Sequence, residues 1–218
     1  MKYKNIFFIF LIILNPIFFS SKEFKIINTI LNSIDESEEL VNQRYNPLIT
    51  QIKEVKNKLG KKSDISNLNF LVEKEKELKQ VYNNFIMSCD DYKKVFNKLD
   101  KNYFELAFKE AYNNEELKEI EVKLNEAQNK FLSLSKAGKI YNEEYNSVAK
   151  TRKELSEQYE QLKMQLMIVK YSSHNSKDEI IDCFKRGDNW IQKEMEFHDF
   201  YSEIKILLTK LENNLKKK

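Results

Sequence analysis

The sequence predicts an all-α fold, an elongated antiparallel coiled coil or helical bundle built from long helices. Apolar residues recur at alternating spacings of three and four through most of the 218-residue chain, and such a stripe must be buried against another helix. The chain contains only three Gly and two Pro, too few for the tight turns of a sandwich or barrel. Charged residues make up 33% of the chain, with Lys and Glu interleaved as on solvated helix faces.

The first 21 residues predict a targeting segment. Lys2 and Lys4 precede an apolar run over residues 6–19, and the small residues Ser20 and Ser21 follow it. Because this run is shorter than the roughly 20 residues of a membrane span, it favours a signal peptide, with a retained N-terminal anchor as the alternative. We therefore expect an exported protein, located in the periplasm, on the cell surface or outside the cell. The composition is similar to that of small exported helical proteins from AT-rich bacterial genomes.

An amphipathic helical segment is predicted from Phe24 to Leu59. Pro47 lies inside it and cannot donate a backbone hydrogen bond. The segment is therefore either one kinked helix or two helices on a shared axis, with the break at residues 44–46. Gly60 predicts the end of the segment and Asp64 the cap of the next helix, so we expect the chain to reverse direction there.

A long seam of heptad a and d positions extends from Leu68 to Val169. It begins at Leu68 (a) and Leu71 (d), and its non-apolar positions are Glu75, Glu110, Asn113, Gly138 and Arg152. The apolar stripe is broad up to Tyr112, which favours a bundle of three or four helices. From Leu117 onwards it narrows to the a and d positions, which is typical of a two-stranded seam.

The polar seam positions predict where the long helix is interrupted and how its register is set. Glu110 and Asn113 are consecutive polar positions, and Asn113–Glu115 resembles a helix cap, so we favour a bend or hairpin near Asn113. Gly138 is a second candidate turn, although the unbroken heptad phase would also suit a continuous helix. Arg152 is unfavourable in a seam unless it meets a carboxylate, and it is a candidate for specifying register or partner.

The C-terminal part is predicted to contain a loop and two helices. Residues 172–178 are polar and predict the loop, and a short helix follows through Phe184. Gly187, within residues 186–189, predicts a second stop, and the last helix begins near Trp190. The expected division is a targeting segment over residues 1–21, a long-helix body over 22–171 and a C-terminal segment over 172–218 packed on the body.

Two cysteines, Cys89 and Cys183, are candidates for a disulfide, because an exported chain meets oxidising conditions. The alternatives are two buried thiols, or a reactive or intermolecular thiol. Glu194 and His198 share a helix face, but a metal site needs three or four ligands, so we expect a solvated charged face there. The sequence contains no catalytic motif, no metal-binding motif and no cofactor-binding motif.

These observations predict a non-enzymatic protein that binds a protein partner, or its own copies through helical seams, or forms a structural part of the cell envelope. The alternatives are a periplasmic holdase-type chaperone and a membrane-anchored coiled-coil scaffold. The formal net charge of +3 is spread over finely mixed Lys and Glu, which argues against nucleic acid as a partner. Contact with a membrane is expected only through the N-terminal segment, if it is not cleaved.

Overall fold

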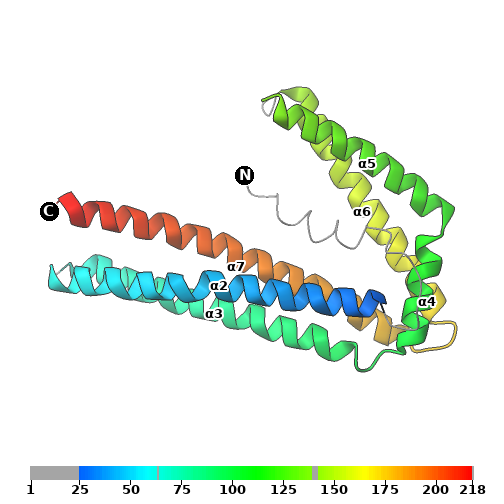
Figure 1. Ribbon diagram of the computed structural model, residues 1–218, viewed down its shortest axis with the longest axis horizontal. Helices are drawn as coiled ribbons and strands as arrows, with labels where there is room; N and C mark the ends of the chain where they lie inside the picture. Colours follow the sequence, from blue (N-terminus) through cyan, green and yellow to red (C-terminus); the bar gives the residue numbers. More distant parts are fainter. Residues whose placement is uncertain (1–24, 63, 139–141, 218) are drawn as a thin grey trace. The chain divides into compact units, whose positions relative to one another are not determined.

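The computed structural model describes residues 25–62, 64–138 and 142–217. The helices in these ranges are α2 (Lys25–Lys61), α3 (Ile65–Val95), α4 (Lys101–Tyr112), α5 (Glu115–Lys136), α6 (Glu143–Tyr171) and α7 (Lys177–Lys217) (Figure 1). The described residues contain no β-strand. The predicted all-α fold of packed long helices is therefore confirmed. The predicted targeting segment lies outside the described residues.

The helices form two compact units. The first contains α2, α3 and α7 from Lys185 onwards, and the second contains residues Leu99–Phe184. The chain therefore passes from the second unit back to the first inside α7. Residues 172–176 form the predicted loop between α6 and α7. The expected division into residues 22–171 and 172–218 stays a prediction.

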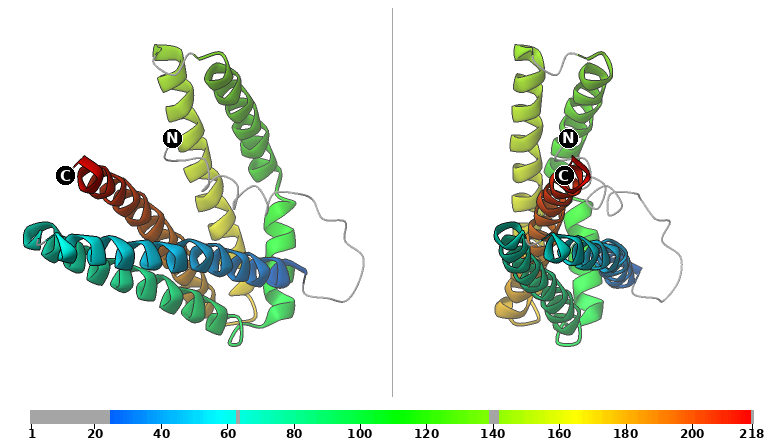
Figure 2. Two further views of the ribbon diagram at one scale, coloured as in Figure 1. Left: turned by 60° about the vertical axis from the view of Figure 1, so that its left-hand side comes forward. Right: turned by 90° about the vertical axis from the view of Figure 1, so that its left-hand side faces the viewer.

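The first unit is a bundle of three helices in which α2 and α3 run in opposite directions (Figures 1 and 2). Lys93 of α3 contacts Asp35 near the start of α2, whereas Glu75 of α3 contacts Lys56 near its end. Helices α2 and α7 are parallel, because Arg44 pairs with His198 and Gln51 with Lys205 at the same sequence separation of 154. The chain reversal expected near Gly60 is confirmed.

Helix α2 is one continuous helix that includes Pro47. Proline removes one backbone hydrogen bond, to the carbonyl four residues earlier. Val41 precedes it, Leu48 and Ile52 follow it, and all three are buried. Burial on both sides of Pro47 holds the helix together, and the alternative of two separate helices is wrong.

The broad seam from Leu68 to Tyr112 contains a break that the sequence did not predict, because the chain turns between α3 and α4. The side chain of Asp100 caps α4 and accepts hydrogen bonds from the backbone N–H groups of Asn102 and Tyr103, at 3.1 and 3.2 Å. The heptad pattern conceals this break, because Phe96 and Leu99 occupy a and d positions and are buried in the turn itself.

After this turn the buried stripe is displaced by one residue. Helix α4 buries Phe104, Ala107 and Ala111, where the heptad pattern predicted Tyr103, Leu106 and Glu110. Near the end of the seam, the predicted d position Val169 is 74% exposed, and α6 instead buries Met167 and Tyr171. A break in the helix allows the next segment to rotate about its own axis, so the phase of the pattern need not survive it.

In the second unit α4 and α5 both lie along α6, and the predicted interruption near Asn113 is a bend. Glu110 of α4 pairs with Lys170 near the end of α6, whereas Phe131 of α5 contacts Tyr145 near its start. The chain reverses after Gly138, whose φ of 71° is a left-handed conformation suited to glycine. The narrow half of the seam is therefore paired within the chain, as an antiparallel hairpin of α5 and α6 (Figure 2).

Helix α7 is continuous over 41 residues, so the stop expected at Gly187 is wrong. A β-carbon at Gly187 would lie 3.0 Å from the Cζ atom of Tyr92 on α3. The glycine therefore makes room for a close aromatic contact. The glycine belongs to the seam, as the spacing of the buried residues of α7 shows. These are Ile180, Cys183, Gly187, Trp190, Glu194, Phe197, Ile204, Leu208 and Leu211.

The contact with Tyr92 predicts different effects for alanine at two helical glycines. A β-carbon at Gly60 would meet no atom within 4 Å, so Gly60→Ala should raise the free energy of unfolding by up to about 1 kcal/mol through helix propensity. At Gly187 the new methyl group would crowd the Tyr92 ring. The free energy of unfolding of Gly187→Ala should therefore be about 1–3 kcal/mol lower than that of Gly60→Ala. Urea denaturation of both variants measures the difference.

The smaller side chain in Tyr92→Leu should relieve the crowding, so that Gly187→Ala becomes stabilising in that background. If both alanine variants change the free energy of unfolding equally in the native background, Gly187 has no packing role.

Candidate functional site

A groove surrounded by charged and amide side chains lies on the first unit. Its volume is about 650 Å³, and it is open to solvent. Helix α2 supplies all but one of the residues around it, and α3 supplies the last. They are Asp35, Glu38, Glu39, Asn42, Gln43, Asn46, Pro47 and Lys93. Because α2 is continuous through Pro47, these side chains project from successive turns of one helix.

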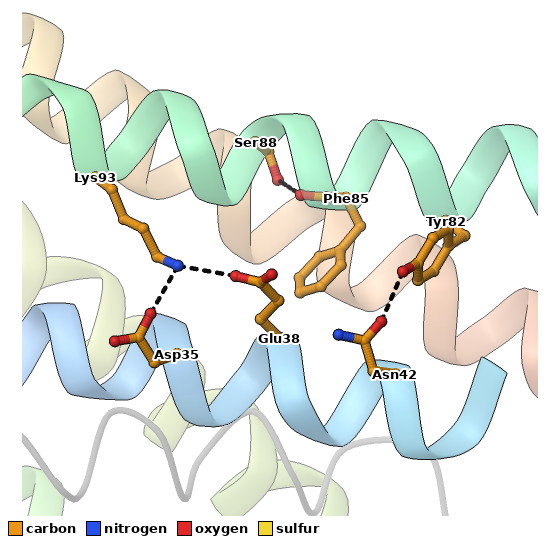
Figure 3. Close-up of polar contacts among 7 residues, drawn as sticks. All are labelled: Asp35, Glu38, Asn42, Tyr82, Phe85, Ser88 and Lys93. Atoms are coloured by element: carbon orange, nitrogen blue, oxygen red, sulfur yellow. Dashed lines mark hydrogen bonds and ion pairs between the residues drawn. The ribbon is translucent and has the colours of Figure 1, made fainter. Parts of the chain in front are cut away.

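Lys93 reaches from α3 to α2 and lies between two carboxylates (Figure 3). Its Nζ atom is 2.6 Å from Asp35 Oδ1 and 2.8 Å from Glu38 Oε2. Burial alone would lower the pKa of Lys93, but the hydrogen bonds and charges of the two carboxylates outweigh it and raise that pKa above its ordinary value. A nucleophilic or basic lysine needs a lowered pKa. This geometry instead keeps Lys93 charged and suits it to holding α3 against α2.

Two tyrosines lie beside the groove, Tyr82 on α3 and Tyr45 on α2. Tyr82 of α3 donates a hydrogen bond of 2.6 Å to the side-chain oxygen of Asn42 (Figure 3). Its ring stacks on Tyr45 of α2 with the ring centroids 3.8 Å apart. Burial, and then the charge of Glu38, raise the pKa of Tyr82. The hydroxyl therefore stays protonated and directs the Asn42 carbonyl oxygen.

Phe85 and Ser88 lie on α3 between Tyr82 and Lys93, and both are buried. The Phe85 ring points toward α2, and its backbone carbonyl accepts a hydrogen bond of 2.6 Å from the Ser88 hydroxyl (Figure 3). Phe85 is fully buried and lies against Phe197 of α7. Phe85 therefore belongs to the aromatic core shared by α3 and α7.

Glu75, the first polar position of the seam, is a buried carboxylate between two lysines. It lies 2.7 Å from Lys56 of α2 and 2.6 Å from Lys79 of α3. Burial by itself would raise the pKa of Glu75, but the hydrogen bonds from both lysines lower it overall. This ionised carboxylate ties α2 to α3 at the end opposite Lys93.

Glu194 and His198 do not form the solvated face expected from the sequence. Glu194 is buried, because it occupies a seam position of α7. Arg44 of α2 is 2.9 Å from His198 Nδ1, and His198 Nε2 is 3.6 Å from Glu194 Oε1. Since a guanidinium only donates, His198 accepts at Nδ1 and carries its proton on the side of Glu194. The spacing of Trp190, Glu194 and Phe197 was the signal that could have revealed this position.

Cys89 and Cys183 are both free and buried in the structure. Cys89 belongs to the first unit and Cys183 to the second. Burial raises the pKa of each thiol to about 12, and nearby carboxylates add to this effect. Neither thiol is therefore suited to nucleophilic chemistry at neutral pH. A disulfide between them stays a prediction.

The candidate register residues Glu110 and Asn113 lie at the α4–α5 bend, and their role in setting the register stays a prediction. The Glu110 side chain is 48% exposed and forms an ion pair of 2.7 Å with Lys170. Asn113 ends α4 as its C-cap, and its neighbour Asn114 caps α5 by accepting from the N–H of Leu117 at 3.1 Å.

The other two candidates lie in the α5–α6 hairpin. Gly138 begins its turn. Arg152 points across the hairpin, donating to Gln128 at 3.0 Å and placing its guanidinium carbon 4.3 Å from the centre of the Phe131 ring. Burial lowers the pKa of Arg152. Its contacts with a glutamine and an aromatic ring give it a packing role between the two helices.

The described ranges contain no group of three or more His, Cys, Asp or Glu that could hold a metal ion. None of the helices described carries an apolar stretch long enough to span a bilayer. The groove beside Lys93 offers charged and amide groups for hydrogen bonding. Comparisons with protein-family models, with curated proteins and with solved structures found no match to this chain.

The lowered pKa of Glu75 predicts a pH-dependent contribution to stability. Because the folded-state pKa lies below the unfolded value of about 4.3, the stabilisation is complete at neutral pH and is lost as the pH falls through the folded-state pKa. Glu75→Gln should lower the free energy of unfolding at pH 7 by about 1–3 kcal/mol. The difference from the native protein should shrink below about pH 4. Urea denaturation between pH 3 and pH 7 measures it, and a difference independent of pH would contradict this role.

The burial of both thiols predicts how they react with an alkylating reagent. We expect iodoacetamide at pH 8 to modify neither Cys89 nor Cys183 in the folded protein, and both in urea without a reductant. Intact mass measures the number of groups added. If the chain takes up no alkyl group in urea before a reductant is added, it contains the disulfide.

Proposed function

We propose that this chain is an exported, non-enzymatic protein that acts by binding another protein, with the α2 groove as a contact surface. The observation that carries the proposal is the polar lining of this groove. Pro47 is the one apolar residue among those around it. Small-molecule sites enclose most of their ligand and are lined mainly by apolar side chains, whereas this groove is open and is surrounded by charged and amide side chains that can hydrogen-bond a partner segment.

The charges of the groove indicate the chemistry of this segment. Its lining carries three carboxylates and one ammonium group. Lys93 is already held by Asp35 and Glu38. Glu39 is exposed and contacts the neighbouring Gln43 at 3.0 Å. The remaining negative charge and the amides of Asn42, Gln43 and Asn46 favour a partner segment that contains Lys or Arg.

The state of the reactive side chains supports binding rather than catalysis. Lys93 is kept protonated, and burial raises the pKa of both thiols to about 12. Export rests on the sequence of residues 1–21, where Lys2 and Lys4 precede the apolar run.

A photo-crosslinking amino acid at Gln43, introduced in the organism that makes the protein, tests the proposal. We expect one main cross-linked protein, to be identified by mass spectrometry and then purified. The same amino acid at Lys53, which is exposed on α2 outside the groove, should not give this product.

Charge reversal then measures the contribution of the groove. Glu39→Lys should weaken binding of the purified partner by at least about tenfold, since it replaces an attraction by a repulsion. Glu54→Lys is the matched control, because Glu54 is exposed on the same helix outside the groove. Equal affinities for the two variants would remove the groove from the interface, and identical cross-links from both positions would contradict specific binding.

A further inference from the structure

We propose that the α5–α6 hairpin binds a second copy of this chain, through a two-fold antiparallel contact centred near residue 124 of α5. This inference concerns the second unit and does not depend on the groove of the first. It rests on three observations: how few residues the hairpin buries, the row of partly buried apolar side chains along one of its sides, and the order of charges along α5.

The hairpin buries few of its residues. Helix α5 buries three of its 22 residues, and α6 three of its 29, whereas α2 buries nine of 37. Most helical stability in proteins comes from packing an apolar face rather than from the helix itself. The seam residues of α5 and α6 are nevertheless almost all apolar, as in the first unit. The hairpin therefore carries apolar surface that its own fold does not cover.

One side of the hairpin carries a row of apolar side chains that are only partly buried. In an antiparallel pair, equivalent heptad positions of the two helices face the same side of the seam. On the a side, Phe131 contacts Tyr145, and Arg152 covers the Phe131 ring. On the d side, Lys130 and Glu144 form an exposed ion pair of 3.0 Å at the margin. The d side otherwise leaves a row of apolar side chains only partly buried, namely Ile120, Ala127, Val148, Leu155 and Leu162, whereas Leu134 is buried.

The order of charges beside this row identifies the occupant. Glu119, Lys123, Glu126 and Lys130 flank the d positions of α5, and all four are exposed. A two-fold axis between residues 124 and 125 places Glu119 opposite Lys130 of the other copy, and Lys123 opposite its Glu126. Each of these four charges thus meets its opposite. Residues 115–171 contain ten basic and ten acidic residues, so two hairpins carry no net charge that would repel them.

The size of the surface is adequate for such a contact. A helix of 22 residues is about 33 Å long, and two helices side by side are roughly 20 Å across. One side of the hairpin therefore offers on the order of 700 Å² per copy, close to the roughly 800 Å² per partner of a standard interface. Covering the d side with a second hairpin would produce a four-helix arrangement with a closed apolar core.

Sedimentation equilibrium of the purified protein over a range of concentrations tests the proposal. We expect a reversible dimer for the native chain. Lys123→Glu should weaken dimerisation by about tenfold or more, because it places two pairs of like charges across the axis, and Glu126→Lys should do the same. An equimolar mixture of these two variants should recover the native affinity, since each copy then presents the charge that the other lacks.

Lys118→Glu is the matched control, because Lys118 is exposed on the outer face of α5, and it should leave the dimer unchanged. The altered residues are all exposed, so circular dichroism should show the same helix content throughout. A native protein that stays monomeric at 100 µM would overturn the proposal. A dimer that tolerates Lys123→Glu, or a mixture of variants that does not recover, would overturn the two-fold antiparallel register.

Discussion

The requirement that each apolar helix stripe be covered by another helix governs this structure. Helix α7 shows it most directly. Its buried residues keep a spacing of three or four from Cys183 to Phe197, with Gly187 and Glu194 included. The unbroken stripe holds α7 as one helix and supplies the third member of the first bundle. Gly187 is compatible with this because the Tyr92 ring fills the space that a side chain would need.

The polar residues of the first unit are placed where they join helices. Lys93 joins α3 to α2 at one end, and Glu75 joins them at the other. Arg44 and His198 join α2 to α7. Ion pairs of this kind add little to stability when they are exposed, but partly buried ones with defined geometry align neighbouring helices. The groove is a consequence of this alignment, because the carboxylates that hold Lys93 are also two of the residues around it.

The two units differ in how completely they cover their own seams. The first has three helices, and its aromatic residues Phe85, Trp190 and Phe197 are buried. The α5–α6 hairpin has two helices along most of its length, and most of its d positions are only partly buried. A two-stranded seam has two open sides, so a cluster such as Phe131, Tyr145 and Arg152 can cover only one of them. The opposite charges along α5 lie beside the other side, where the partly buried d positions are.

The sequence by itself determined the all-α class, the reversal near Gly60, the interruption at Asn113, the turn at Gly138 and the loop after Tyr171. These features depend on local chemistry: the 3.5-residue apolar period, helix caps and the backbone freedom of glycine. Only the tertiary structure decided the break before Asp100, the continuity of α7 and the groove at Lys93. The reason is that contacts distant in sequence control each of them. Burial of Phe96 and Leu99 conceals a turn, Tyr92 requires a glycine inside a helix, and Asp35, Glu38 and Lys93 meet only when α3 folds back on α2.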